Sequence, residues 1–178
     1  MKTSFRFALA VVIGLAAGAA AIAGVKPFVS DKSKDYFGYY LPDATVKTGR
    51  YQLRNLFIGG KDEFVSFESG KADKAFAAVM AEFDDVTSPK KTGEDGQEFY
   101  TRTIRVLPTG YTVGNGIVHF AGTDKTLGAV VFDGKFEKDF FKKPTPDVPH
   151  PDDHPILKGK LTVGKQSFTV AFNWFGGD

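Results

Sequence analysis

The second half of the chain is dominated by an alternation of apolar and polar residues. In residues 130–137, 157–163 and 168–174 every second position is apolar or glycine, and most positions between them are polar or charged. Because successive side chains of a strand point to opposite faces of a sheet, each segment predicts a strand with one buried face. The dipeptides Asn115-Gly116 and Gly164-Lys165 separate β-like runs by the two residues that a tight hairpin turn requires. The pattern therefore predicts antiparallel strands joined by short turns.

Weaker strand signals occur earlier in the chain, and one segment fits two structures. Residues 99–107 are rich in β-forming side chains, and residues 51–58 and 63–68 are two shorter runs of the same kind. Residues 72–83 carry apolar side chains at the spacing of an amphipathic helix, although the second half of this segment also alternates as a strand does. The sequence favours a helix of about three turns over residues 72–83 and leaves a strand in their second half open.

The N-terminus has the organisation of an export signal. Lys2 and Arg6 precede an uncharged apolar run over residues 7–25, and residues 21–23 offer a small-residue cleavage site. The run is also long enough to span a bilayer as a helix. Residues 1–23 are therefore predicted to be a signal peptide or a membrane anchor. They direct the protein to the periplasm or out of the cell, or hold it at the inner membrane through residues 7–25 if the segment is not cleaved.

The rest of the chain is predicted to form one domain. Residues 24–48 mix charge, proline and aromatic residues without a period and predict a linker or lead-in, part of which packs on the domain. Residues 49–178 predict a single β-rich domain with a proline-rich loop at 142–155. The expected fold class is mainly β, as an antiparallel β-sandwich or small β-barrel with at most one short helix, preceded by the N-terminal apolar export or anchor helix.

Composition argues against several classes of function. Lys2 and Arg6 account for the whole formal net charge of +2, so the exported part is formally neutral and no nucleic-acid partner is expected. The chain contains no cysteine, which excludes thiol catalysis, disulfide scaffolds and zinc–thiolate sites. Stability must then come from packing, and the many phenylalanines beyond the leader are the expected substance of the core.

Aromatic residues on the predicted inner faces are one candidate ligand-binding site. They suit either the lining of a cavity for an apolar small molecule or a filled core. They are Phe132, Phe136, Phe168, Phe172 and Trp174. The closing segment LKGKLTVGKQSFTVAF, residues 157–172, resembles the final hairpin of the YceI-like and lipocalin-like periplasmic barrels. That resemblance implies a barrel that binds isoprenoid or other lipids.

A proline-flanked loop supplies a candidate metal site. His150, Asp152, Asp153 and His154 bring two imidazoles and two carboxylates within five residues, a donor set suited to a weakly bound divalent metal. Polar residues between prolines are equally typical of a solvated loop that binds nothing. No other cofactor is expected.

His119 and two acidic pairs complete the candidate chemistry. His119 points to the opposite sheet face from Val118 and Phe120, and we expect a core or interface histidine rather than a general base because no serine has the setting of a nucleophile. The pairs Asp84-Asp85 and Glu94-Asp95 lie among turn-forming residues. We interpret them as solubilising turn and edge residues rather than as the carboxylate pair of a glycosidase.

These observations favour a non-enzymatic, exported or membrane-tethered envelope protein whose β-domain binds a partner protein or an apolar ligand. An uncleaved anchor would suit an accessory subunit held beside an envelope or membrane protein complex. The alternative is a periplasmic hydrolase or metal-binding enzyme that uses His119 or the His150/His154 loop.

Overall fold

The computed structural model describes residues 28–72, 75–94, 96–138 and 154–177. It confirms a mainly β fold with one short helix, and 58% of the described residues lie in strands. The predicted export helix over residues 1–23 lies outside the described residues. Within the described ranges, no helix combines the length and the apolar character needed to cross a membrane.

The described residues form thirteen strands and one helix. In chain order these elements are β1 (Phe28–Ser30), β2 (Gly38–Pro42), β3 (Lys47–Thr48), β4 (Tyr51–Ile58), α1 (Lys61–Glu68), β5 (Val79–Asp85), β6 (Lys90–Thr92), β7 (Glu98–Tyr100), β8 (Thr103–Val106), β9 (Pro108–Gly114), β10 (Ile117–Asp124), β11 (Gly128–Phe136), β12 (Leu157–Val163) and β13 (Gln166–Phe175).

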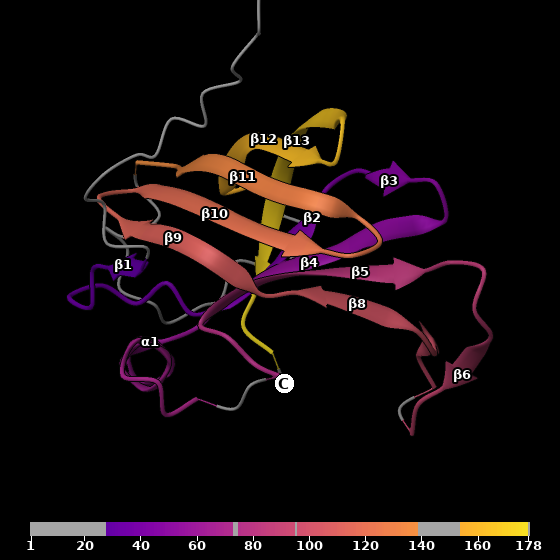
Figure 1. Cartoon of the computed structure of the whole chain (residues 1–178), viewed down its shortest axis with the longest axis horizontal. Coiled ribbons are helices and arrows are strands. Elements are labelled where there is room, and N and C mark those ends of the chain that lie inside the picture. Colours follow the sequence, from indigo (N-terminus) through magenta and orange to yellow (C-terminus); the bar gives the residue numbers. More distant parts are fainter. Residues whose placement is uncertain (1–27, 73–74, 95, 139–153, 178) are drawn as a thin grey trace, which may run out of the picture.

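Most strands belong to one large sheet that curls into a half-barrel. Its strand order is β1-β9-β10-β11-β12-β13-β2-β4-β5-β8, and β3 pairs with β4 outside this path. Every pair in it is antiparallel except β1 with β9. In Figure 1 the group β9 to β12 lies above β4, β5 and β8, and β13 and β2 lead from one group to the other. The strands β6 and β7 form a separate two-stranded ribbon.

The two halves of the curled sheet are also joined directly by the chain. A single residue, Leu107, separates the end of β8 from the start of β9 at Pro108. The pairing of β9 with β10 shifts register between Ala121 and Gly122, and such a bulge bends a strand. Gly122 permits the close crossing, because a Cβ there would lie 2.5 Å from the Leu107 carbonyl oxygen. The bend lets the continuous segment β8–β9 pair with β5 at one end and with β10 at the other.

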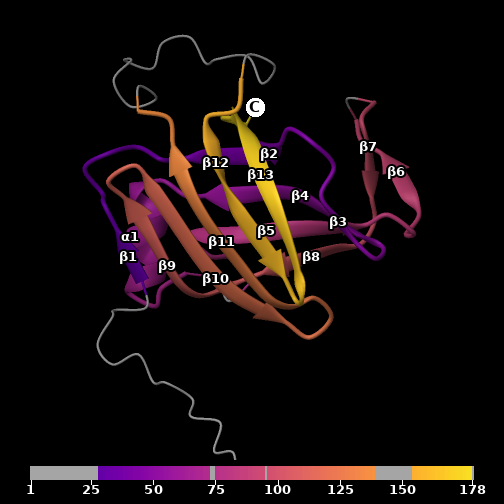
Figure 2. The ribbon, with the colours of Figure 1, turned by 90° about the horizontal axis from the view of Figure 1, so that it is seen from above.

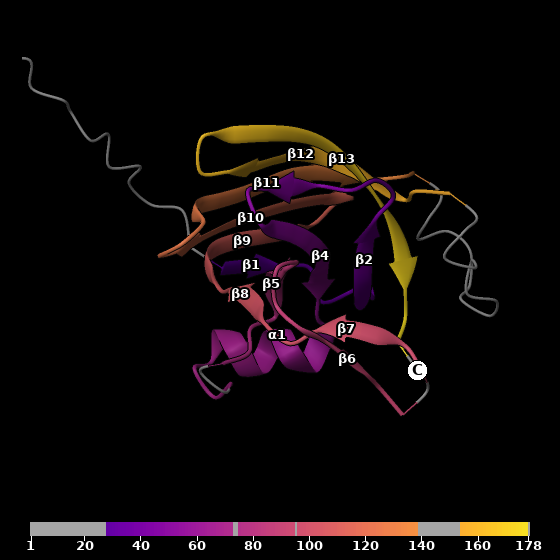
Figure 3. The same ribbon diagram turned by 90° about the vertical axis from the view of Figure 1, so that its right-hand side faces the viewer.

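The half-barrel has two different ends. We call one the helix end, because α1 lies there, and the other the ribbon end, because the β6–β7 ribbon lies there. Figures 1 and 2 show α1 at the left, and β3, the β10–β11 turn and the ribbon at the right. Figure 3 shows α1 beneath the sheet. At the helix end Phe64 of α1 is buried, with its ring centroid 5.6 Å from that of Tyr111.

The core fills the concave face of the sheet with aromatic side chains. Phe132 and Phe172 meet edge to face with ring centroids 5.3 Å apart. The ring of Phe136 lies 5.5 Å from that of Tyr36 and 5.6 Å from that of Tyr40. All five side chains belong to one buried cluster. The rings are therefore largely in contact with one another.

The predicted alternation and both hairpins are confirmed. In β11, Val130, Phe132 and Phe136 are buried while Asp133 and Lys135 are exposed. The turn at Asn115-Gly116 joins β9 to β10 with positive φ angles of 52° and 74°, as a type I′ turn requires. Gly164-Lys165 joins β12 to β13 in the same two-residue manner.

The favoured helix over residues 72–83 is wrong, and the strand that was left open is correct from Val79 onward. Residues 79–85 form β5, which is hydrogen-bonded to β4 on one side and to β8 on the other. Val79, Ala81 and Phe83 enter the core. β4 pairs with this segment along its whole length and β8 pairs with residues 81–84, and nearly all of its side chains are buried. These tertiary contacts outweigh a local helical spacing.

The strand predicted over residues 63–68 is also wrong, because these residues lie in α1. Asp62 and Glu63 occupy the first turn, where negative charge is favourable at a helix N-terminus. Phe64 and Phe67 are three residues apart, so both reach the ring of Tyr111 from one helical face. In a helix both rings pack against the core, with Phe64 buried and Phe67 partly buried.

The predicted lead-in over residues 24–48 contributes more than a linker. Its described part supplies β1, β2 and β3, and β2 pairs with both β13 and β4 in the middle of the sheet order. Tyr36 and Tyr40 of this segment are buried in the core, and the Tyr40 hydroxyl donates to the Tyr36 carbonyl at 2.7 Å. The sheet therefore begins well before residue 49.

Candidate functional site

The predicted ligand-binding aromatics lie in two settings. Phe132, Phe136 and Phe172 are buried in the core cluster, whereas Phe168 and Trp174 are partly buried and pack against it. The indole of Trp174 donates to the Phe37 carbonyl at 2.8 Å. These five side chains share the concave side, as their alternation predicts, and the described contacts connect the buried ones with other rings.

The predicted metal ligands fall mostly outside the described residues. His150, Asp152 and Asp153 lie there, so their arrangement is not described. Nε2 of His154 lies 3.4 Å from Oε2 of Glu137, and the other carboxylate oxygen of Glu137, Oε1, accepts a hydrogen bond from Lys158 at 3.1 Å. In the ranges that the structure describes, no group of three or more His, Asp or Glu side chains could hold a metal ion.

His119 belongs to β10 and lies on the convex face of the sheet, beside β11. Its Nδ1 is 2.6 Å from Oδ1 of Asp133, its cross-strand neighbour. The side chain of His119 is 44% exposed. The sequence predicted a core or an interface histidine, and the exposure rules out the core setting. Cross-strand pairs of this kind stabilise a sheet surface.

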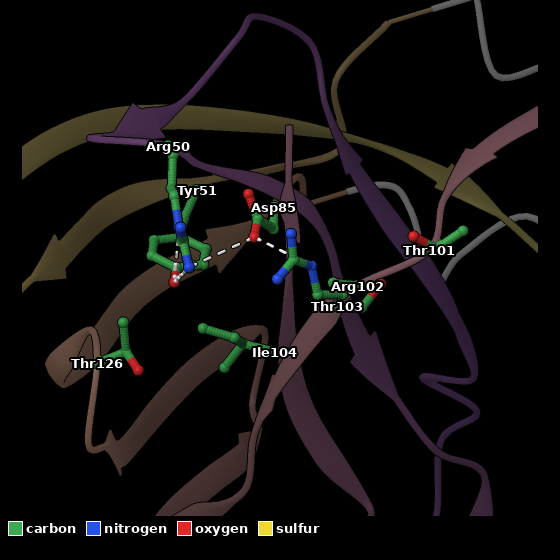
Figure 4. A pocket seen from close by; sticks show the side chains of 8 residues that line it. All are labelled: Arg50, Tyr51, Asp85, Thr101, Arg102, Thr103, Ile104 and Thr126. Atoms are coloured by element: carbon green, nitrogen blue, oxygen red, sulfur yellow. Dashed lines mark hydrogen bonds and ion pairs between the residues drawn. The ribbon is translucent and has the colours of Figure 1, made fainter. Parts of the chain in front are cut away.

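A pocket at the ribbon end brings together the charged groups that sequence reasoning did not select. Figure 4 shows it from close by. It has a volume of about 380 Å³, within the range of small-molecule sites, and Tyr51 and Ile104 pack on the core beside it. Thr126 reaches it from the β10–β11 turn, so the pocket lies where the two halves of the sheet face each other. It is lined by Arg50, Tyr51, Asp85, Thr101, Arg102, Thr103, Ile104 and Thr126.

The ends of three strands position the charged residues. Asp85 is the last residue of β5 and lies in register with Tyr51, the first residue of β4. Arg50 precedes Tyr51, and its carbonyl accepts a hydrogen bond from Val86 at 3.0 Å. Arg102 precedes β8, and its carbonyl accepts from the backbone N–H of Asp85 at 2.9 Å. Both arginines are therefore tied by backbone to the same strand end.

Asp85 is a buried carboxylate held in place by its own turn. Its side chain is 3% exposed, and Oδ1 accepts hydrogen bonds from the Thr87 hydroxyl at 2.6 Å and the Thr87 N–H at 3.1 Å. The hydrogen bond from the Thr87 hydroxyl is the main cause that lowers the pKa of Asp85; burial opposes it, and the charges of Arg50 and Arg102 assist it. Asp85 is thus anionic at neutral pH.

The two arginines flank Asp85, but Asp85 does not take up their hydrogen-bond donors. Oδ2 of Asp85 lies 3.5 Å from Nη2 of Arg50 and 3.6 Å from Nε of Arg102. These distances exceed the 2.7–2.9 Å or so that is usual for charge-assisted hydrogen bonds. The side chains of Arg50 and Arg102 are 51% and 62% exposed, and Arg50 also donates to the Tyr51 hydroxyl at 2.9 Å. The pocket therefore presents two guanidinium groups against one carboxylate.

The sequence does carry a signal for Asp85, namely its position in the alternation of inward-facing and outward-facing residues of β5. In β5 the core positions are Val79, Ala81 and Phe83, and Asp85 is the next position on the same face. An acid that continues an apolar face is a buried charge in need of partners. Interpreting the pair Asp84-Asp85 as solubilising turn residues overlooked this difference between the two neighbours. Arg50 and Arg102 carry no comparable local signal.

Comparison of the chain with protein-family models, with curated proteins and with solved structures finds no match.

Proposed function

We propose that this chain is a non-enzymatic, exported or membrane-tethered envelope protein whose β-domain binds a partner protein at the ribbon end of the half-barrel. The observation that carries the proposal is the pocket of Arg50, Asp85 and Arg102, which opens beside the protruding β6–β7 ribbon. Its side chains are suited to binding: two guanidinium groups, hydroxyls and a carboxylate already fixed by ion pairs.

The interior favours surface recognition over carriage of an apolar ligand. Phe132, Phe136 and Phe172, which we considered as the lining of a ligand cavity, are each at most 7% exposed and contact other rings. A closely packed interior offers an apolar molecule no space without displacing side chains. We accordingly infer a small open barrel filled by its own side chains rather than a hollow carrier.

The β6–β7 ribbon is suited to contact with a partner protein. Figure 2 shows it standing away from the main sheet. Lys90 ties its two strands together, because its ammonium lies 2.9 Å from Glu98 and 5.4 Å from the ring centroid of Tyr100. On the ribbon, Phe99 is 40% exposed. An exposed aromatic ring on a braced ribbon beside a charged pocket resembles the anchor residues of protein interfaces.

The compartment is the first test of the proposal. We expect fractionation to place the protein in the periplasm, in the medium or at the inner membrane. N-terminal sequencing then distinguishes a start at Gly24 from the intact segment over residues 1–23, that is, a free protein from a tethered one. Recovery of the intact chain in the cytosol would contradict the proposal.

Site-specific photocrosslinking in cells tests the binding surface. We expect p-benzoylphenylalanine in place of Phe99 to give a discrete adduct with one envelope protein. The matched control places the same probe at Thr169, an exposed residue of β13. Adducts at Phe99 alone support recognition by the ribbon. No adduct at Phe99, or equal adducts at both positions, would contradict it.

A further inference from the structure

The ribbon-end pocket has an unbalanced positive charge. Arg50 and Arg102 face one another across Asp85, so that two cationic groups are opposed by one anionic group. The neighbouring acid, Asp84, is directed elsewhere, since its Oδ1 accepts from the Thr103 hydroxyl at 2.8 Å and lies 4.0 Å from Arg54. The pocket keeps about one unit of positive charge.

The donors of the two arginines are geometrically available. A guanidinium carries five N–H donors in a planar fork. Arg50 uses Nε and Nη2 on the Tyr51 hydroxyl, at 3.1 and 2.9 Å, which fixes the plane of its side chain. The contacts of both arginines with Asp85 are longer than charge-assisted hydrogen bonds. Figure 4 shows both guanidinium groups directed toward the interior of the pocket.

Asp85 positions the arginines rather than competing for the ligand. It is 3% exposed, and its Oδ1 is occupied by the hydroxyl and N–H of Thr87. The charge of this buried carboxylate keeps the two flexible arginine side chains close to the same place in the pocket. They therefore lose less conformational entropy when an anion binds between them. The arrangement is preorganised for a second anion in front of Asp85.

We propose that Arg50 and Arg102 form a binding site for a carboxylate group at the mouth of the half-barrel. A planar carboxylate matches the planar fork of a guanidinium and can be shared between two of them. Thr101 and Thr126 also line the pocket, and Ile104 adds an apolar wall. The inference deepens the proposed function and rests on it for one source of the group, an acidic side chain or C-terminus of the partner protein. The other source is a free organic acid.

The test is an NMR titration of the whole chain that follows the arginine Nε–Hε signals. Acetate and succinate are the small-acid probes, and a short alanine peptide with a free C-terminal carboxylate, compared with its amide, is the peptide probe. We expect saturable shifts of the Arg50 and Arg102 signals. Each of R50Q and R102Q is expected to weaken binding about tenfold, the effect of losing a hydrogen bond between charged groups.

R54Q is the matched control, because the Arg54 side chain is 47% exposed and its contact with Asp84 is a weak 4.0 Å ion pair. It should leave the affinity unchanged. Binding of acetate or succinate indicates a free acid, and binding of only the carboxylate peptide indicates the partner. No saturable shift with any probe, or an equal loss in R54Q, overturns the carboxylate site. Because crosslinking at Phe99 does not depend on these probes, it fails or succeeds separately.

Discussion

Replacing Phe132 with alanine should destabilise the protein by about 3–5 kcal/mol, the usual cost of truncating a buried phenylalanine. Phe132 is 1% exposed and meets Phe172 edge to face. Its ring also lies directly over Gly134, where a Cβ would collide with it. Because the neighbours are packed from several strands, they cannot close around the space that the ring leaves. Urea denaturation followed by circular dichroism measures the change.

F99A is the matched control for this prediction. Phe99 is 40% exposed on the two-stranded ribbon, and we expect its truncation to change the free energy of unfolding by about 0.5 kcal/mol or less. The pair of variants separates core from surface, since F99A should remove binding to the partner while F132A removes stability. A cost below about 1 kcal/mol for F132A would instead indicate that the ring borders open space, as a ligand cavity requires.

Replacing Asp85 with asparagine should lower Tm by several degrees near pH 7, and the deficit should shrink in acid. The substitution keeps the shape of the side chain but leaves Arg50 and Arg102 facing each other across a neutral group. The pKa of Asp85 is lower in the folded chain than its ordinary value of 3.8. Its contribution to stability is therefore complete above about pH 3.8 and is lost as the pH falls below that value through the folded-state pKa.

Thermal unfolding of the wild type and D85N across this pH range tests the prediction. The control is D84N, which alters the adjacent acid of the convex face, whose partners are Thr103 and the exposed Arg54. We expect a smaller deficit in D84N than in D85N. A deficit in D85N that stays constant down to about pH 2 would show that the charge of Asp85 is not what stabilises the ribbon end.

The alternation of apolar and polar residues was most informative for strands with one buried face and one solvent-exposed face. The alternation in β11 to β13 correctly placed Val130, Phe132 and Phe172 on the concave face. In β5 the alternation was ambiguous, because Met80 on the opposite face is also apolar and only 2% exposed. With apolar residues on both faces the segment also fitted the spacing of a helix, which the sequence favoured.

The candidate site could not be predicted from the local sequence, for a different reason. The phase of Asp85 marked one buried acid, but Arg50 and Arg102 meet it only because β4 and β8 pair with opposite sides of β5. Neither arginine differs in its sequence neighbourhood from an ordinary surface cation such as Arg54. A convergence of this kind depends on strand pairing between distant segments, which no short window contains.

By itself the sequence determined that this chain is mainly β, which residues of its last strands face inward, and where its tight turns lie. These properties follow from the period-two geometry of a strand and from the positive φ angles of a turn, both of which act between near neighbours. Only the tertiary structure decided that residues 61–68 are helical, that residues 79–85 are a strand, and that two arginines meet one carboxylate. Each of these depends on what packs against the segment, and that partner comes from another part of the chain.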